Sequence, residues 1–566
     1  MKKLPIGRSD FKDLIEEKFF FVDKSLFIKE IIKEVSQITL LPRPRRFGKT
    51  LNLSMLRYFF ERTDNKKEIK QIFSGLAIEK EEAFAEHLCR YPIIFLTFKE
   101  IKSGCFEEDI ASVKRLIADE YRRHAYLLES ESLNDFEKQD FTNIAAIKAD
   151  ISLFKNSLLY LSAYLHKHHK EKPIILIDEY DTPVIAAYLG NYYEKTINFF
   201  RNFLGAGLKD NTNIYKGVLT GILRVAKESI FSDMNNLGVY SLMREEYSDY
   251  FGFTEDEVKE LASAYSIKHR FNDIKKWYDG YIFGKKTIYN PWSILNFISS
   301  KDKEYRPYWA NTSSNLLIKD LLVSSSSLIK EELYDLLKDI PVVKRVEENI
   351  AFENLKDNQD TLYGFLLFSG YLKAHKCKTV EDEKYCKLQV PNTEVKLIFK
   401  DIILQWVNES YRDNDRLHKM LLALVQGEVK VFEEILNDFV LTTLSYFSTG
   451  KSKDVEKVYQ AFVLGLLVNL ALDYEVSSEK ESGFGRYDIS IIPKDINKKA
   501  IIMELKKIDS DETKDTALDS ALAQIEEKKY ETAIKARGVM DIEKFGVVFD
   551  GKRVWVKKKR STDMPV

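Results

Sequence analysis

The sequence predicts an α/β protein that is divided into more than one domain. The chain has 566 residues, which exceeds the size at which a single hydrophobic core stops growing. Hydrophobic residues make up 45% of the chain and charged residues 31%, a globular balance that argues against long disordered stretches. Up to about residue 245, short apolar runs alternate with longer helical patterns, and this alternation favours a parallel sheet covered by helices.

Changes in the pattern of apolar, aromatic and polar residues along the sequence predict three domains, 1–245, 246–400 and 401–566. In the first, the runs "ITLL", "YPIIFLTF", "PIILIDEY" and "YKGVLTG" are the expected strands. The second is expected to be a mainly helical lid or connecting region, with Thr254 capping a helix that starts in "FGFTEDEVKEL". The third is expected to contain a helix near 454–472, strands near 486–492 and 500–506, a helix near 515–533, and a hairpin turning at Asp550 and Gly551.

Charge, apolar runs and cysteines limit the class of protein. No apolar segment follows the two lysines at the N-terminus, and the longest apolar run, Ala461–Leu472, is too short to span a bilayer. We therefore expect a cytoplasmic protein without a membrane partner. The segment "KCKTVEDEKYCK", which carries Cys377 and Cys386, predicts two strands around an acidic turn rather than a metal site. Because net charge is −1, a polyanionic partner would need a local basic patch.

The stretch "LLPRPRRFGKT", Leu40 to Thr50, ends like a phosphate-binding loop. In the pattern G-x-x-x-x-G-K-[ST], backbone N–H groups and a helix N-terminus hold phosphate, a lysine reaches the outer phosphates, and a hydroxyl holds magnesium. Gly48, Lys49 and Thr50 take these last positions here, between an expected strand and an expected helix. The sequence therefore predicts a nucleotide site, and the alternative is an ordinary basic loop between a strand and a helix.

The first half of this loop departs from the pattern. Arg43 stands where the first glycine is usual, and Pro42 and Pro44 beside it lack N–H donors. We expect Arg43 to adopt a conformation that glycine takes more easily, and Arg45 or Arg46 to replace the lost donors with charge.

Two further strand ends carry polar residues. In "KPIILIDEYDTP", Asp178 is expected to hold magnesium through water and Glu179 to polarise the attacking water. In "YKGVLTGILRVAK", Thr220 is expected to sense whether a γ-phosphate is present. Arg224 is expected to neutralise the negative charge that develops during phosphoryl transfer. Structural roles are the alternative for both Thr220 and Arg224.

These segments together resemble a known family. "LPRPRRFGKT", "YPIIFLTFK", "LIDEYDTP", "LTGILRVAKESIFS", "FGFTEDEV" and "KKWYDGYIFG" are similar to the AAA-ATPase-like family of bacterial and archaeal proteins, which typically carries a C-terminal PD-(D/E)XK nuclease-like domain. The resemblance implies a P-loop NTPase parallel sheet with helices on both faces and a C-terminal restriction-endonuclease-like α/β domain. It also implies ATP and Mg²⁺ as cofactors, and a phosphate loop that does without its first glycine.

A second candidate site lies in "GFGRYDISIIPKDINKKAIIMELKK". Asp488 lies on one expected strand, and Glu504 and Lys506 lie on one face of the next. Residue 496 is midway between Asp488 and Glu504 and also central in the polar connection Pro493–Lys499, so a simple hairpin places the two carboxylates opposite each other. Clustered carboxylates and a lysine suit metal-dependent phosphodiester cleavage, and the alternative is a solvated hairpin face.

The resemblance extends to the neighbouring helices. Gln524 and Tyr530 match the Q-x-x-x-x-x-Y that often follows this hairpin in PD-(D/E)XK nucleases, and the resemblance makes Gln524 a catalytic candidate. Glu456 lies where such folds often place a further acidic metal ligand, and Glu481 also resembles the pattern. The chain departs from the family at Gln460, where histidine is common.

The sequence as a whole predicts an enzyme in which an ATP-binding domain governs a nuclease. The nuclease is expected to use Mg²⁺, with Mn²⁺ as an alternative, and to act on DNA. The basic segment "GKRVWVKKKRS" from Gly551 to Ser561 could follow a phosphate backbone, and its alternative is a solvated tail. The alternative function is a nucleotide-controlled switch that binds nucleic acid or protein through a nuclease-like domain that does not cut.

Overall fold

The computed structural model describes most of the chain, in two compact units. The described residues are 2–225, 230–231, 234–309, 315–323, 325, 327–337, 339–350, 352–355, 358–409, 414–443, 463, 466–467, 470, 473–478, 481–482, 485–486, 488–508, 512–550 and 553–560. The first unit comprises Met1–Leu321 and Asp339–Leu397, and the second comprises Leu322–Lys338 and Ile398–Val566. Most of the middle region 246–400 is therefore part of the same compact unit as the phosphate loop.

A five-stranded parallel sheet forms the centre of the first unit. Its strand order is β2–β3–β4–β1–β6, and every pairing is parallel. The strands are β1 (Ile38–Pro42), β2 (Ile93–Thr97), β3 (Ile174–Asp178), β4 (Lys216–Gly221) and β6 (Leu237–Val239). All residues of β1, β3 and β4 are buried, as expected for strands that are covered on both faces.

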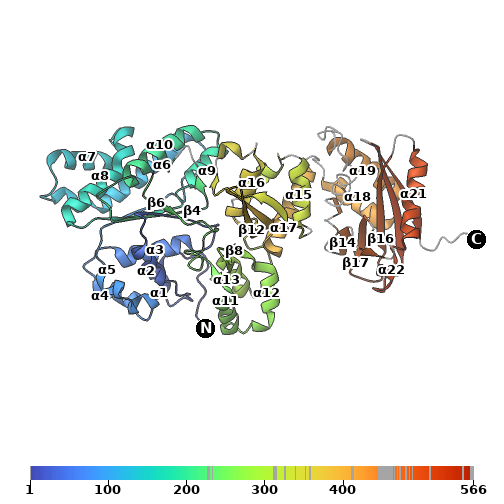
Figure 1. Cartoon of the computed structure of the whole chain (residues 1–566), viewed down its shortest axis with the longest axis horizontal. Coiled ribbons are helices and arrows are strands. Elements are labelled where there is room, and N and C mark those ends of the chain that lie inside the picture. The colour runs from blue at the N-terminus through green and yellow to red at the C-terminus, as the bar shows by residue number, and fades with distance from the viewer. Residues whose placement is uncertain are drawn as a thin grey trace, which may run out of the picture. The chain divides into compact units, whose positions relative to one another are not determined.

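Helices cover both faces of this sheet, which confirms the predicted fold class (Figure 1). One face carries α1 (Phe11–Glu16), α2 (Leu26–Lys33), α3 (Lys49–Phe60), α4 (Lys66–Ile72) and α5 (Glu82–His87). The other carries α6 (Phe106–Arg123), α7 (Asp135–Ala145), α8 (Ile151–His169) and α10 (Tyr193–Leu208), and α9 (Thr182–Leu189) precedes α10. Short 3₁₀ helices span Ala77–Lys80 and Ala125–Glu129.

The rest of the first unit contains more strand than the sequence predicts. One small sheet has the order β7–β9–β8, from β7 (Phe253–Thr254), β8 (Tyr281–Phe283) and β9 (Lys286–Tyr289). A second has the order β10–β13–β12, from β10 (Val342–Arg345), β12 (Lys373–Val380) and β13 (Glu383–Gln389). β5 (Arg224–Val225) pairs with β11 (Asn349–Ile350). The sequence did not predict these short strands, which lie among the helices of the predicted helical middle region.

Helices surround these small sheets. They are α11 (Glu255–Ala264), α12 (Phe271–Tyr278), α13 (Pro291–Ser299) and α16 (Gln359–Phe368), with 3₁₀ turns at Lys268–Arg270 and Phe352–Asn354. The helices α14 (Asn315–Val323) and α17 (Thr393–Glu409) begin in the first unit, which ends at Leu321 in α14 and at Leu397 in α17. Thr254 caps α11 as predicted, because its side chain accepts from the backbone N of Glu257. The acidic turn between β12 and β13 is also confirmed, but Cys377 and Cys386 form a disulfide across that hairpin, which the sequence interpretation missed.

The second unit is a five-stranded mixed sheet between two layers of helices. Its strand order is β14–β17–β18–β19–β20, with only β18 and β19 parallel. The strands are β14 (Tyr474–Ser478), β17 (Ile489–Pro493), β18 (Ala500–Lys507), β19 (Ile542–Asp550) and β20 (Arg553–Arg560), and β15 (Glu481–Ser482) pairs separately with β16 (Gly485–Arg486). The predicted hairpin between β19 and β20 is confirmed.

Alternate residues of β18 pack against the two helix layers. Ile501, Met503 and Leu505 pack with α18 (Asn414–Gln426) and α19 (Val429–Thr443), whereas Ala500 and Ile502 pack with α21 (Lys514–Glu527). The unit also contains α15 (Ser327–Leu337) and α22 (Thr532–Lys535). Most of the helix predicted near 454–472 falls outside the described residues. No helix in the described part of the chain has the length and apolar character to cross a membrane.

Candidate nucleotide site and candidate metal centre

The phosphate loop runs from the end of β1 to the start of α3. Gly48 is in the left-handed region with φ 86° and precedes the first residue of the helix, so a glycine is required there by the backbone. Arg46 also has a left-handed conformation, with φ 70°. Arg43 is not among the residues with positive φ, so the expectation that it adopts a glycine-like conformation is wrong.

Arg43 is instead a buried anchor for the loop. Its guanidinium donates to three backbone carbonyls, those of Pro42 at 2.8 Å, Tyr240 at 2.6 Å and Tyr247 at 3.3 Å. The same group lies over the rings of Phe251 and Phe283. Burial lowers the pKa of Arg43 to about 9. Arg43 thus anchors the first half of the loop through its side chain, in a backbone conformation that does not require glycine.

Lys49 lies with its ammonium inside the curve of the loop. Its Nζ donates to the carbonyl oxygens of Arg43 and Pro44, each at 2.9 Å, and only 5% of the residue is exposed. Burial lowers the pKa of Lys49, and the charges of Glu179 and Asp178 act in the opposite direction. The loop therefore holds a buried cation beside carboxylates; a cation in this position can contact phosphate, and a carboxylate can hold a metal.

Asp178 joins three elements at the carboxyl edge of the sheet. It ends β3, is fully buried, and accepts hydrogen bonds from Thr50 Oγ1 at 2.7 Å and from Thr220 Oγ1 at 2.6 Å. Burial raises the pKa of Asp178, while these two hydrogen bonds lower it. Three residues that the sequence singled out separately are thus in direct contact.

Glu179 follows Asp178 in a left-handed conformation, with φ 50°, and its carboxylate accepts a hydrogen bond from Thr182 Oγ1 at 3.2 Å.

The sequence interpretation missed Asp181, which is fully buried and accepts hydrogen bonds from the backbone N of Ile222 and Leu223, at 2.8 and 3.0 Å. Burial raises the pKa of Asp181. The third acidic residue of "DEYD" was the sequence feature that could have pointed to Asp181. In the structure Asp181 binds the backbone of the turn that follows β4.

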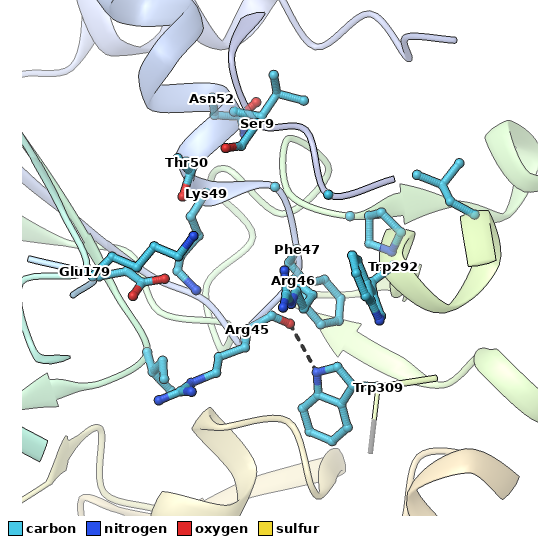
Figure 2. Close-up of a pocket in the computed structure, with 18 of the residues that line it drawn as sticks. Ser9, Arg45, Arg46, Phe47, Lys49, Thr50, Asn52, Glu179, Trp292 and Trp309 are labelled. Atoms are coloured by element: carbon cyan, nitrogen blue, oxygen red, sulfur yellow. Dashed lines mark hydrogen bonds between the residues drawn. The ribbon is translucent and has the colours of Figure 1, made fainter. Parts of the chain in front are cut away.

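A cavity of about 500 Å³ opens beside the loop (Figure 2). The predicted residues that line it are Arg45, Arg46, Gly48, Lys49, Thr50 and Glu179. Residues from other parts of the first unit also line it, and the sequence interpretation missed them; they include Ser9, Lys99, Lys102, Trp292 and Trp309. Arg46 lies over the ring of Trp292, and the indole nitrogen of Trp309 donates to the carbonyl of Arg45.

Arg224 does not lie with the residues that line the cavity. It lies on β5, where it pairs with Asn349 of β11, and it is not among the residues that line the cavity. Its neighbour on the preceding strand, Thr220, reaches the site only through Asp178. Arg224 is therefore not a lining residue of this cavity, and its role in neutralising charge stays a prediction.

The second candidate site lies at the β17–β18 hairpin. Ile489 pairs with Met503 and Ile491 with Ile501, a register that continues to Asp488 opposite Glu504, as the sequence predicts. Asp488 Oδ2 accepts from the backbone N of Leu505 at 2.7 Å, which fixes this carboxylate beside the next strand.

Side chains from α21 and the turn after it reach the same place. Gln524 donates to Glu504, a carboxylate that is only 3% exposed, and Lys506 Nζ donates to Ser520 Oγ at 2.7 Å. Burial raises the pKa of Tyr530; a hydrogen bond with Gln524 lowers it, and the charges of Glu504 and Asp488 raise it further. Asp488, Glu504, Gln524 and Tyr530 therefore form one cluster.

The proposed third carboxylate, Glu456, lies outside the described residues, as does the side chain of Glu481. Among the described residues, no group of three histidine, cysteine, aspartate or glutamate side chains is gathered closely enough to hold a metal. The lysines of β20 contact protein groups: Lys557 pairs with Asp519, Lys559 with Glu526, and Lys558 donates to the carbonyl of Gly427. These contacts weaken the idea that β20 follows a phosphate backbone.

Comparison with known proteins matches two separate regions of the chain. Residues 5–231 match a family model described as a predicted AAA-ATPase, and residues 454–559 match a model described as the PD-(D/E)XK nuclease superfamily. An uncharacterized protein in the vnfD 5′ region of Azotobacter chroococcum mcd 1 is 24% identical over 545 residues, which cover 95% of this chain and 94% of that protein. Both matched regions agree with the architecture that the sequence motifs predict.

Proposed function

We propose that this chain, which joins a predicted AAA-ATPase region to a PD-(D/E)XK nuclease-superfamily region, binds and hydrolyses ATP with Mg²⁺ and cuts DNA in a metal-dependent reaction. The observation that carries the proposal is the contact of Asp178 with Thr50 and Thr220 beside the buried Lys49. A buried carboxylate, a helix-start hydroxyl and a lysine in a loop are the groups that P-loop enzymes use.

The residues of the loop fit a magnesium–triphosphate. Hard cations prefer carboxylate and hydroxyl oxygens, which Asp178 and Thr50 supply. Lys49 would exchange its two carbonyl partners for phosphate oxygens, since charge-assisted bonds to an anion are the stronger ones. Arg45 and Arg46 add positive charge at the cavity, where Pro42 and Pro44 provide no N–H donors. Bound Mg²⁺ would neutralise part of the phosphate charge.

Hydrolysis would depend on Glu179. This carboxylate lines the cavity and is held by Thr182, so it can orient a water and accept its proton. Asp178 is bound on both oxygens by hydroxyl groups and is better suited to holding the metal.

The nuclease site would use Asp488 and Glu504 as ligands of Mg²⁺, with Mn²⁺ as an alternative. The bound metal would neutralise charge on the scissile phosphate. Gln524 fixes the orientation of Glu504, and Lys506 would help to position the phosphate and the attacking water. The superfamily match supports phosphodiester cleavage, and we propose DNA rather than RNA as the substrate that the cleavage assay below tests.

The alternative is a nucleotide-controlled switch that binds nucleic acid or protein without cutting. One observation favours it: within the described residues the hairpin brings together two carboxylates, without a third histidine, cysteine, aspartate or glutamate close enough to share a metal. An assay of DNA cleavage distinguishes the two functions.

One pair of assays tests the proposal. Lys49→Ala should weaken ATP binding at least about tenfold, or about 1.4 kcal/mol, by calorimetry, while the exposed lysine variant Lys67→Ala should bind as wild type does. Unchanged affinity in Lys49→Ala would remove the nucleotide site. The purified protein should also be incubated with linear, circular and single-stranded DNA and with RNA, with Mg²⁺ or Mn²⁺, with and without ATP. Cleavage of DNA supports the nuclease, and binding without cleavage supports the switch.

A further inference from the structure

Two tryptophans from outside the region matched as an AAA-ATPase contact successive arginines of the phosphate loop (Figure 2). The guanidinium of Arg46 lies 4.3 Å from the ring centre of Trp292, near the start of α13. The indole Nε1 of Trp309 donates to the carbonyl oxygen of Arg45 at 3.3 Å. All four residues line the same cavity.

The ring of Trp292 is held in place. Its Nε1 donates to the carbonyl of Tyr308 at 3.1 Å, and its backbone N donates to the Asn290 side chain at 2.9 Å. Trp309 is 2% exposed, packs against the ring of Tyr371 at 4.9 Å, and donates its backbone N to Glu394 at 2.6 Å. The loop therefore contacts two oriented indoles.

The conformation of the loop explains why such support is useful. Arg46 has φ 70°, a region that costs energy for a residue with a side chain and persists only when its surroundings hold it. Stacking on an aromatic face also leaves the edge of a guanidinium available, because its five N–H donors lie in the plane of the group. Arg46 can bind Trp292 with its face and an anion with its edge.

We propose that Trp292 is a positioning residue of the nucleotide site: its ring holds the Arg46 guanidinium in the cavity with its N–H edge directed to the nucleotide's phosphates. The bond from Trp309 to Arg45 fixes the adjoining part of the loop. The middle region thereby completes a phosphate site that the matched region leaves without two N–H donors, at Pro42 and Pro44. This inference rests on the proposed nucleotide binding.

A double-mutant cycle tests the inference, with a non-hydrolysable ATP analogue and Mg²⁺ in a calorimeter. Arg46→Ala should weaken binding about tenfold and Trp292→Leu about threefold to fivefold, because the aromatic contact with a partly exposed cation is modest. The double variant should bind no more weakly than Arg46→Ala alone, since Trp292 acts only through Arg46. Additive losses would overturn the inference, because they would mean that the ring acts independently.

Two more variants keep the test decisive. Trp292→Phe retains an aromatic face and should lose less affinity than Trp292→Leu, so equal affinity in wild type and both variants would also contradict the inference. Trp277→Leu is the matched control, because Trp277 stacks on Tyr305 in the same region and is not among the residues that line the cavity. It should lower the melting temperature without changing affinity for the analogue.

Lys49→Ala separates this inference from the function on which it rests. If Lys49→Ala binds the analogue as tightly as wild type, the proposed nucleotide site is wrong. If Lys49→Ala loses binding while Trp292→Leu retains it fully, the site stands and only the role of Trp292 is wrong.

Discussion

Thr50 and Asp178 are 128 residues apart in the chain, and Thr50 Oγ1 donates to Asp178 Oδ2 at 2.7 Å. The bond connects the first turn of α3 to the end of β3, two strands away from β1 in the sheet. Thr220 holds the other oxygen of the same carboxylate. The three side chains thus place two hydroxyl groups and one carboxylate at the start of the phosphate-loop helix, where the proposed nucleotide-bound cation would find oxygen ligands.

Thr50→Val should weaken nucleotide binding in Mg²⁺ at least about fivefold and have a smaller effect in the presence of a chelator. The reason is that the methyl group keeps the volume of the side chain but supplies no oxygen to the metal. Calorimetric titration with ATP in both buffers measures the difference. Thr142→Val, on the exposed surface of α7, is the control. An equal loss in both buffers would mean that Thr50 acts on the loop and not through the metal.

Glu179→Gln should bind ATP as wild type does and hydrolyse it far more slowly, because the amide keeps the shape of the side chain but cannot accept a proton. Asp178→Asn should in addition weaken the dependence of binding on Mg²⁺. Release of phosphate and calorimetric affinity are the measurements. Equal turnover by wild type and Glu179→Gln would place the base elsewhere.

Local sequence was sufficient for some of these features. The strand, loop and helix around Lys49 are contiguous, and the polar ends of β3 and β4 meet because carboxyl ends of parallel strands share one edge. The pairing of Asp488 with Glu504 was predicted from the midpoint of the short connection between their strands. In a simple hairpin, the position of the turn determines which residues lie opposite each other.

Other features depend on contacts between residues far apart in the chain, which the periodicity of apolar residues in the sequence does not reveal. Arg43 binds carbonyls of Tyr240 and Tyr247, about 200 positions away, so its sequence position suggested only a missing glycine. Trp292 and Trp309 reach the loop from even farther along the chain. The disulfide across β12 and β13 was missed because two cysteines suggest no pairing by themselves.

Arg43→Gly restores the usual loop pattern, yet it should destabilise the first unit. The change leaves buried carbonyls without a donor and removes contacts with two aromatic rings, at a cost of about 2–4 kcal/mol. Thermal unfolding monitored by calorimetry measures this cost. An unchanged or higher melting temperature would show that the guanidinium contributes nothing to the loop's anchorage.

Glu394 should make stability fall as pH rises. It is fully buried, and burial raises its pKa to about 7, although bonds from Trp309 and Ser293 lower it in part. A glutamate in the unfolded chain titrates near 4.3, so between these values the folded state retains a proton that the unfolded state has lost. The stabilising effect of protonation is therefore complete below about pH 4 and is lost as pH rises through about 7.

Glu394→Gln removes this titration and keeps a hydrogen-bonding side chain of the same size. The difference in unfolding free energy between the variant and wild type should grow from pH 5 to pH 8, to at most about 3 kcal/mol. Melting temperatures across that range are the measurement. If the melting temperatures of the variant and the wild type changed in parallel with pH, the raised pKa of Glu394 would be contradicted.

Asp488 and Glu504 lie opposite each other in the hairpin register, so a divalent ion should relieve their repulsion and raise the melting temperature without nucleotide. The shift should be measured in Lys49→Ala, where nucleotide-linked magnesium is removed. Adding Asp488→Ala in that background should reduce the shift, because a ligand is lost. A metal-dependent shift of the same size in both proteins would place the binding ion elsewhere.

The most direct test of a nucleotide-dependent nuclease is cleavage of DNA by Asp488→Ala beside wild type, with Mg²⁺ and ATP, while release of phosphate from ATP is followed in the same samples. Wild type should cut DNA, and Asp488→Ala should lose cleavage while hydrolysing ATP at the wild-type rate, because the hairpin and the phosphate loop lie in different compact units. Cleavage at the wild-type rate by Asp488→Ala would contradict the account and remove the nuclease assignment from this hairpin.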